Sequence, residues 1–196
     1  VRMCHCSARD AGDGRFFEHM LTCDRVRGAN RVFRHNVILA AMFNCIQKLG
    51  VMAVVEPTFY IYDDGTSKRP DMTCFLENPV VTDLVISNDI ENAVKAKIDK
   101  HEAAAKRIGH EFIPCGMTIW GEFDPSCDKF LRAVFRHLPR GPRRIAILQT
   151  KRAMSEAWLI GTTSLIRGVT DHSAIAMDLF DVDTPFDVAG TTTSGP

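Results

Sequence analysis

The sequence has no long apolar run, no net charge and no internal repeat. No stretch approaches the roughly 18 to 20 consecutive apolar residues that a membrane helix requires, so we expect no membrane contact. Charged residues from Arg2 to Asp10 interrupt the N-terminus, and a secretory signal peptide is therefore not expected. The 24 basic and 24 acidic side chains cancel, which means that any attraction for an anionic polymer must be local.

The cysteines lack the pattern of a disulfide framework. Their number, seven, is odd, and four of them lie in apolar segments like ordinary buried thiols: Cys45, Cys74, Cys115 and Cys127. This usage favours a reducing compartment. At 196 residues the chain suits one domain, alone or with a small appendage. Because it begins with Val1 rather than Met, we expect it to be a piece of a longer polypeptide or a processed product.

Apolar spacing and turn signals predict the order of the elements. A helix is expected from Asn36 to Gly50, and another over 88–109 with Asn88 or Asp89 as its cap. The remaining segments are predicted as strands at 52–62, 72–76, 80–86 and 111–120, and as helices at 126–138 and 142–168. Adjacent strands followed by a helix and a further strand indicate an α/β (α+β) protein with a mixed sheet flanked by helices.

Four soft metal ligands stand in two close pairs near the N-terminus. Cys4, Cys6, His19 and Cys23 form the pattern C-x-C-x12-H-x3-C, and thiolate with imidazole suits tetrahedral Zn2+. A closed set of four leaves no open position, so this metal would be structural. The C-x-C spacing is tight, which leaves His5 as a competing ligand. The alternative is that these residues are scattered and hold no metal.

Two acids interrupt segments that otherwise read as strands. Asp71 follows Pro70 at the entry to one strand, and Asp83 lies inside the next. The turn at 77–79 makes the two strands a hairpin, in which both acids can be neighbours. Carboxylates so placed repel each other unless a cation lies between them, and Mg2+ prefers oxygen ligands, water and phosphate. Alternatively, the acids pair with basic side chains in a structural network.

Lysines follow on the long helix after the second acid. Lys97 and Lys100 are three residues apart and share a helix face, with Lys95 nearby. An ammonium group beside a metal-bound water and a phosphate can orient the nucleophile or offset developing charge. The alternative is an ordinary solvated helix face.

The order of these motifs resembles the restriction-like endonuclease region of site-specific non-LTR retrotransposons. The resemblance covers residues 4 to about 123. Besides the Cys/Cys/His/Cys segment, it rests on RHN at 34–36, EP at 56–57, KRPD at 68–71, TDLVIS at 82–87, KIDKH at 97–101 and GMTIWGEF at 116–123. It implies a PD-(D/E)XK fold, preceded by a CCHC-type zinc knuckle, that nicks double-stranded DNA with Mg2+ or Mn2+. The exposed 3′ hydroxyl would prime the reverse transcriptase of the same polyprotein, in the nucleus.

Residue by residue, the resemblance implies that Asp71 and Asp83 are the metal-binding acids and that Lys97 and Lys100 are the catalytic lysines. The common nuclease motif places its lysine two residues after the second acid, where this chain has Val85. The chain therefore resembles a variant in which the lysine has moved to the helix.

Two further positions depart from the family pattern or allow two interpretations. The family's aromatic residue after the last lysine is His101 here, which weakens the assignment of Lys100. Glu56, before Pro57, is either a third acid of the metal site or a strand-end acid paired with Arg34.

Contact with DNA must come from local basic patches. Arg31, Arg34 and His35 precede or open a helix, and they either contact DNA or orient the zinc segment against the core. Arg143 and Arg144 belong to a second cluster, which either touches nucleic acid or is a solvated helix face.

We therefore expect four parts in the chain. These are a zinc knuckle and basic linker at 1–34, a restriction-like endonuclease core at 35–140, a helical extension at 141–183 and a disordered tail at 184–196. Two rival functions remain: a non-catalytic nucleic-acid-binding module of the same fold, and a cellular repair nuclease.

Overall fold

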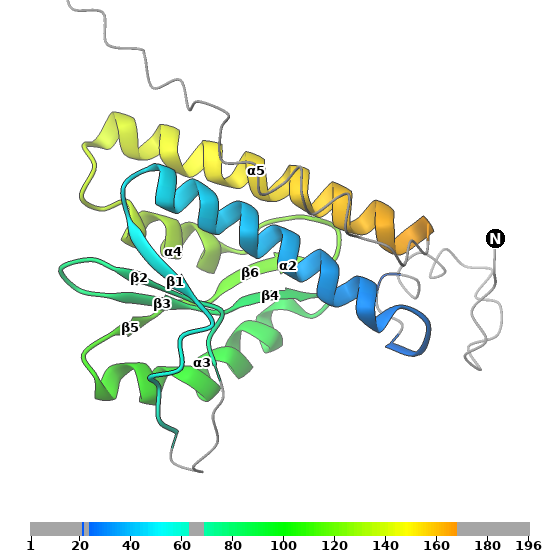
Figure 1. The fold of residues 1–196 in the computed structure, drawn as a ribbon, viewed down its shortest axis with the longest axis horizontal. Coiled ribbons are helices and arrows are strands. Elements are labelled where there is room, and N and C mark those ends of the chain that lie inside the picture. The colour runs from blue at the N-terminus through cyan, green and yellow to red at the C-terminus, as the bar shows by residue number, and fades with distance from the viewer. Residues whose placement is uncertain (1–20, 22–23, 63–68, 168–196) are drawn as a thin grey trace, which may run out of the picture.

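The computed structural model describes residue 21 and residues 24–62 and 69–167, and it describes side chains at Leu21, 31–62 and 69–166 (Figure 1). The expected zinc ligands lie outside this part of the chain: Cys4, Cys6, His19 and Cys23, together with His5. The expected tail at 184–196 lies outside it as well. The described residues therefore cover most of the predicted nuclease core and most of the predicted extension.

In the described part of the chain, six short strands form two small sheets. The first sheet has the order β1-β2-β3-β5 and contains Met52–Val55, Met72–Phe75, Val80–Thr82 and Glu111–Phe112. In it β1 and β3 both run antiparallel to β2, whereas β3 and β5 are parallel. The second sheet pairs β4 and β6 in parallel, at Leu84–Ser87 and Cys115–Thr118. The mixed α+β class predicted from the sequence is confirmed.

The parallel strands of the two sheets share one register, broken at a single point. Val81 pairs with Phe112 and Leu84 pairs with Cys115, so the same offset continues from one sheet to the other. At the break Asp83 lies opposite Pro114, which has no backbone N–H to donate. The break thus separates β3 from β4 at the residue predicted to be the second acid.

Several predicted elements have different lengths in the structure. The strand expected over 52–62 ends at Val55, because Glu56 adopts a left-handed φ of 48° and Pro57 follows. The strands expected over 80–86 and 111–120 are each interrupted, at Asp83 and at 113–114. Spacing of apolar residues does not reveal such breaks, because the residues on either side stay buried.

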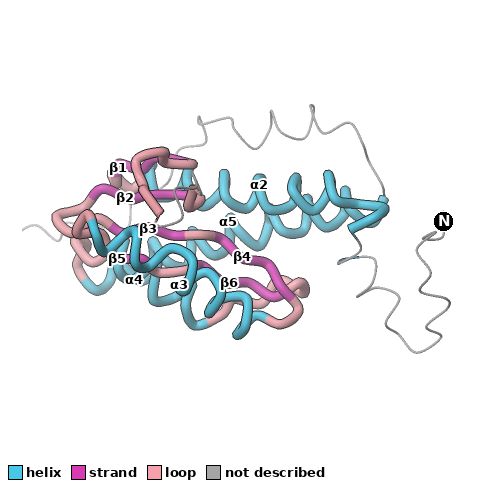
Figure 2. Tube along the Cα trace, turned by 90° about the horizontal axis from the view of Figure 1, so that it is seen from below, coloured by secondary structure: helices cyan, strands magenta, loops and turns pink. Residues whose placement is uncertain are grey.

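The helix expected from Asn36 begins twelve residues earlier, as α2 (Asp24–Lys48). The expected boundary between residues 34 and 35 consequently falls inside a continuous helix. The long α5 (Arg140–Arg167) lies along α2, as Figures 1 and 2 both show. Their backbones come close at Gly161, where an added Cβ would lie 2.7 Å from Cα of Arg34. The part of the predicted extension that the structure describes, up to residue 167, is therefore packed along α2.

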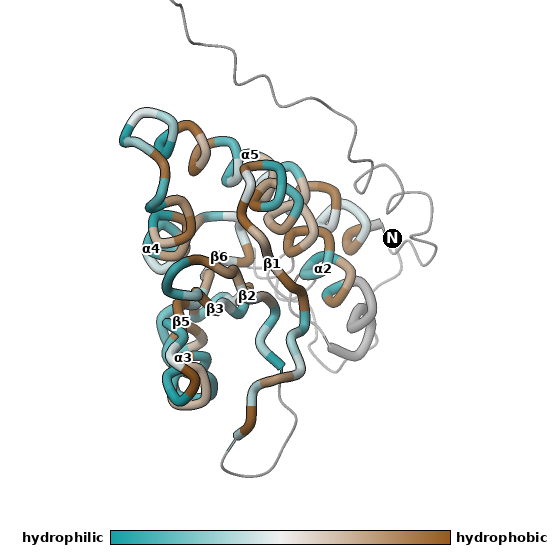
Figure 3. Tube along the Cα trace, turned by 60° about the vertical axis from the view of Figure 1, so that its left-hand side comes forward, coloured by the Kyte–Doolittle hydropathy of each residue, from teal (hydrophilic) through white to brown (hydrophobic). Residues whose placement is uncertain are grey.

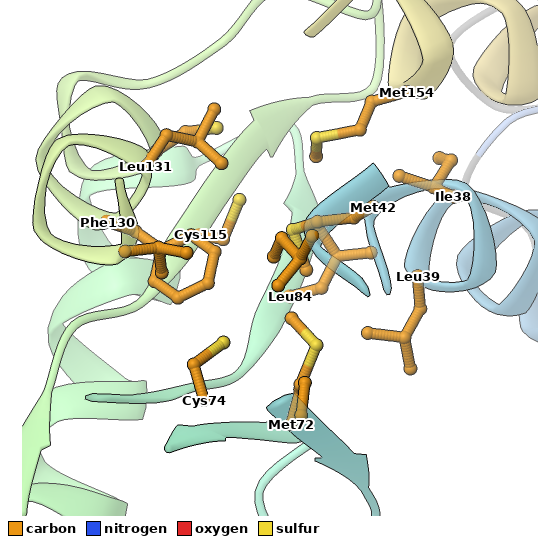
Figure 4. Packing of buried hydrophobic residues seen from close by; sticks show 14 of the residues in the cluster. Ile38, Leu39, Met42, Met72, Cys74, Leu84, Cys115, Phe130, Leu131 and Met154 are labelled. Atoms are coloured by element: carbon orange, nitrogen blue, oxygen red, sulfur yellow. The ribbon is translucent and has the colours of Figure 1, made fainter. Parts of the chain in front are cut away.

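Two apolar clusters cover the two faces of the strands. On one face, residues of α2, α5 and α4 (Pro125–Val134) enclose the strands, and Figure 4 shows Met42, Phe130 and Met154 converging there. On the other face, α3 (Ile90–Arg107) packs Ala104 and Ala105 against Val81. Figure 3 shows the strands as largely apolar segments among helices of mixed hydropathy.

The helix α3 is well defined at both ends. The Asp89 side chain accepts a hydrogen bond from the Asn92 amide, and Gly109 follows the helix with a φ of +77°.

Four cysteines predicted to be ordinary buried thiols are buried and free: Cys45, Cys74, Cys115 and Cys127. Within the described residues, no helix combines the length and the apolar character needed to cross a bilayer.

Candidate metal and catalytic site

The two predicted acids come together at the break between the sheets. Met72 pairs with Thr82 in the antiparallel register of β2 and β3, so Asp71 and Asp83 are the next neighbours along the two strands. Their carboxyl groups are close enough for each to shift the pKa of the other. The Asp71 side chain is 18% exposed and that of Asp83 is 3% exposed. Asp71 therefore faces the solvent side of this pair, and Asp83 the interior.

Asp71 is held in place from the backbone of two neighbouring segments. The Glu56 amide donates to the Asp71 carbonyl oxygen at 2.9 Å. The Leu84 amide, the first of β4, donates to Oδ2 of the Asp71 carboxyl group at 2.7 Å. The carboxyl group thus bridges the start of β2 to the start of β4, which fixes its position at the break.

A histidine from α2 also reaches Asp71. Nε2 of His35 lies 3.0 Å from Asp71 Oδ2 and 3.1 Å from the Leu84 carbonyl oxygen. Burial alone would lower the pKa of His35, but the hydrogen bond to Asp71 and the charge of that carboxyl raise it above its ordinary value. The sequence predicted that His35 contacts DNA or the zinc segment, whereas the structure places it against Asp71.

Asp83 contacts two basic side chains of α3. Lys97 Nζ donates to Asp83 Oδ1 at 2.8 Å, and His101 Nε2 lies 2.6 Å from Oδ2. The His101 N–H bond is not aligned with the oxygen, so we treat this contact as electrostatic. Lys100 is exposed, and no contact joins it to either acid in the described part of the chain. Of the two predicted lysines, the structure brings only Lys97 to the site.

The pKa values of the two acids shift in opposite directions. Burial raises the pKa of Asp71 above the usual carboxyl value, and the neighbouring Asp83 adds to that rise. Burial would also raise the pKa of Asp83, but contacts with His101, Asp71 and Lys97 together hold it well below the usual value. The carboxyl of Asp71 therefore retains a proton more readily, while Asp83 is ionised.

The donor chemistry of this pair fits a hard divalent cation. Two neighbouring carboxyl groups repel each other when both are ionised, and a cation that prefers oxygen ligands removes this repulsion. Among the described residues, no group of three or more His, Cys, Asp and Glu side chains has the arrangement of a complete metal site. Asp71 and Asp83 would thus supply two protein ligands and leave the others to water and phosphate, as is usual for Mg2+.

The candidate third acid points away from this pair. The Glu56 side chain is 68% exposed and lies 3.9 Å from Arg69. The expected pairing of Glu56 with Arg34 is wrong, because Arg34 is buried beside Gly161 at the crossing of α2 and α5. Burial and the neighbouring Arg31 lower the pKa of Arg34 to about 10. Arg34 therefore belongs to the helix interface and not to the surface.

The predicted DNA-binding residues of the second cluster have separate environments. The Arg143 guanidinium donates to the carbonyl oxygens of Arg136 and Leu138, and it thereby closes the turn between α4 and α5. Arg144 is exposed and lines a pocket of about 580 Å³ between these helices. The other basic residues that line this pocket are Arg132, Arg140, Arg143 and Lys151, and it also contains one acid, Asp128.

The sequence did not predict the contacts of three residues with the acids or with their partners. His101 was within reach of sequence reasoning, because it lies four residues after Lys97 on the same helix face. The other two carry no such signal, because Tyr62 contacts His101 across 39 residues and His35 contacts Asp71 across 36 residues.

Comparisons with protein-family models and with curated proteins found no match. The functional assignment therefore depends on the geometry of Asp71, Asp83, Lys97 and their neighbours.

Proposed function

We propose that this chain is a divalent-metal-dependent endodeoxyribonuclease of the restriction-like PD-(D/E)XK kind. The observation that carries the proposal is the meeting of Asp71 and Asp83 across β2 and β3, with Lys97 on the second acid. A buried pair of acids is costly to fold unless it serves a ligand or is fully paired. An ammonium group beside such a pair is one arrangement that can support metal-dependent phosphodiester hydrolysis.

In this proposal each side chain has a defined task. Asp71 and Asp83 hold Mg2+ or Mn2+, which when bound supplies Lewis acidity to a water molecule and to the scissile phosphate. Lys97 orients the attacking water and offsets the charge that develops on the phosphate. His35 and the Leu84 amide keep Asp71 turned toward Asp83. Hydrolysis breaks the bond between phosphorus and O3′, which leaves a 5′ phosphate and a free 3′ hydroxyl.

The biological setting of the proposal follows from the resemblance of the sequence motifs. The free 3′ hydroxyl would prime the reverse transcriptase of a non-LTR retrotransposon polyprotein in the nucleus, with double-stranded DNA as the target. A zinc knuckle formed by Cys4, Cys6, His19 and Cys23 would precede the nuclease. The pocket that Arg144 lines would hold the DNA backbone, because its arginines can neutralise phosphates.

One observation favours the rival function of a binding module without catalysis. Lys97 and His101 already contact both oxygens of Asp83, and His35 contacts Asp71, so the acids are paired without any metal. A structural network of this kind would bury the same charges at similar cost. The two functions differ in whether a divalent ion changes the behaviour of the protein.

A plasmid-nicking assay separates these two functions. We expect supercoiled plasmid to become nicked with Mg2+ or Mn2+ and to stay intact with EDTA. Asp71→Ala should reduce nicking to background and leave DNA binding largely unchanged. Asp99→Ala, which removes an exposed acid of α3, is the matched control and should nick like the wild type. Cleavage that survives Asp71→Ala would refute the nuclease assignment.

A further inference from the structure

A chain of two buried side chains lies behind Asp83, on the side of α3. His101 is 1% exposed, and its Nε2 lies 2.6 Å from Asp83 Oδ2. The other ring nitrogen, Nδ1, is hydrogen-bonded to the hydroxyl of Tyr62, which is 7% exposed. Tyr62 comes from the segment after β1, so three separate segments contribute to this chain of contacts.

Both ring nitrogens of His101 are held by neighbouring side chains. Nδ1 is hydrogen-bonded to the Tyr62 hydroxyl, and Nε2 lies against the Oδ2 atom of Asp83. With a partner at each nitrogen, the imidazole ring stays turned toward Asp83.

The imidazole ring is also fixed by packing. The Tyr62 ring meets it edge-on, with ring centres 5.6 Å apart and planes at 75°. The Phe112 ring lies on another side, with ring centres 5.3 Å apart. His101 is enclosed and cannot reach a bound DNA strand, so any effect it has on cleavage must pass through Asp83.

The two oxygens of Asp83 differ in their access to solvent. Oδ2 meets the buried His101, whereas Oδ1 meets Lys97, whose side chain is 27% exposed. An ion that arrives from solvent can displace a mobile ammonium group more easily than an enclosed ring. Oδ1 is therefore the oxygen that is open to exchange.

We propose that His101, held by Tyr62, is a positioning residue that fixes Oδ2 of Asp83 and so presents Oδ1 for the divalent cation. The inference rests on the proposed nuclease function and extends it by assigning a role to His101 and Tyr62, which are neither the acids nor the lysines of the proposed site. In metal sites, partners that orient a ligand typically change affinity or activity by about 10-fold to 100-fold when they are removed.

Mn2+ binding to the full chain tests this inference without relying on cleavage. The amount of free Mn2+ is followed by electron paramagnetic resonance, and only sites that disappear in Asp83→Ala are counted. We expect His101→Leu to weaken this binding by about 10-fold to 100-fold. His101→Gln can place an amide N–H near the position of Nε2, and it should recover most of the affinity. Tyr62→Phe should fall between the wild type and His101→Leu.

The chain contains a matched control for the tyrosine and histidine pair. The Tyr60 hydroxyl contacts Nδ1 of His110 at 2.9 Å, but this pair does not touch the acids. Tyr60→Phe and His110→Gln should therefore leave Mn2+ binding unchanged. Their folding, followed by circular dichroism and thermal unfolding, sets the standard for the other variants.

Several results would overturn the inference. Wild-type Mn2+ affinity in folded His101→Leu, or equal losses in the Leu and Gln variants, would make His101 a packing residue only. If His101→Leu does not fold, wild-type affinity in Tyr62→Phe has the same meaning. A wild type that binds Mn2+ at Asp83 but does not nick plasmid would refute the nuclease function alone, since the affinity comparison would still decide the role of His101.

Discussion

At the scale of single residues, two lysines on one helix face have different surroundings. Lys97 is half-buried and donates to Asp83, whereas Lys100 is exposed. We expect Lys97→Gln to slow nicking by about 10²-fold to 10⁴-fold, the range for a positioned group that assists proton transfer or charge development. Lys100→Gln should cut at nearly the wild-type rate. Single-turnover nicking with saturating DNA and metal measures both, and equal losses in the two variants would contradict the assignment.

The raised pKa of Asp71 predicts that neutralising this residue raises the stability of the fold and abolishes nicking. Because the pKa of Asp71 is raised in the folded protein, protonation of Asp71 stabilises the fold, and this stabilisation is lost as the pH rises through the folded-state pKa. Asp71→Asn mimics the protonated form and keeps an oxygen for the Leu84 amide. At pH 7 this variant should be inactive in nicking and more stable than the wild type.

Urea unfolding at several pH values measures this difference in stability. The advantage of Asp71→Asn should shrink as the pH falls through the ordinary carboxyl range, because Asp71 then carries its proton in both the folded and unfolded states. Asp128→Asn, in which an acid paired with Lys151 at the surface is replaced, is the control and should not gain stability at pH 7. A loss of stability at pH 7 in Asp71→Asn would show that the charged form is the one the fold requires.

The residues that could be predicted from the sequence are those linked by a short turn or a helix period. The turn between Asp71 and Asp83 indicated that both acids lie on neighbouring strands, and the structure places them so. The contact of His35 with Asp71 spans 36 residues and depends on how α2 packs over the strands. Such a contact is set by tertiary packing, which no local pattern encodes.

At the scale of elements, α2 and α5 come closest at Gly161. Alanine in place of glycine usually stabilises the interior of a helix by about 1 kcal/mol. At Gly161, however, an added Cβ would lie 2.7 Å from Cα of Arg34, so the helices must separate. We expect Gly161→Ala to lower the free energy of unfolding by roughly 1–3 kcal/mol, the usual cost of overpacking.

Gly141 provides the control for this prediction. It lies in α5 as well, but no atom comes within 4 Å of a Cβ placed there. Gly141→Ala should leave the free energy of unfolding unchanged or raise it. Urea unfolding of the two variants compares them directly, and equal stability of Gly161→Ala and Gly141→Ala would mean that the helices are not tightly packed at this crossing.

The elements show where apolar spacing is informative and where it fails. The spacing of buried residues from Val37 onward predicted the second half of α2, but the polar first half gave no such signal. The first half of α2 is helical because it extends the later turns of the same helix, and those turns pack against α5 and the strands. The breaks at Asp83 and at 113–114 were missed because they leave the apolar pattern intact.

At the scale of the whole molecule, the proposed nuclease function requires a chain with no net charge to bind DNA through local patches. We propose the pocket between α4 and α5 for this contact, because Arg132, Arg140 and Arg144 line it. We expect the triple alanine variant to bind duplex DNA more weakly. The slope of log affinity against log salt should fall by about 0.9 for each phosphate that the variant no longer neutralises.

Fluorescence anisotropy with a labelled duplex at several salt concentrations measures this slope. Arg152→Ala is the control, because Arg152 is exposed and paired with Glu156. It should leave the slope unchanged. Triple-variant binding with the wild-type slope would place the DNA elsewhere on the molecule.

In the proposed site, Asp71 and Asp83 share one divalent cation. Soaking crystals of the chain in Mn2+ tests this, because anomalous scattering locates the ion without any assumption about activity. We expect a single strong peak beside both carboxyl groups, and loss of that peak in Asp83→Ala. Intact Asp71 and Asp83 side chains with no Mn2+ between them, at a concentration that supports nicking, would refute the shared site.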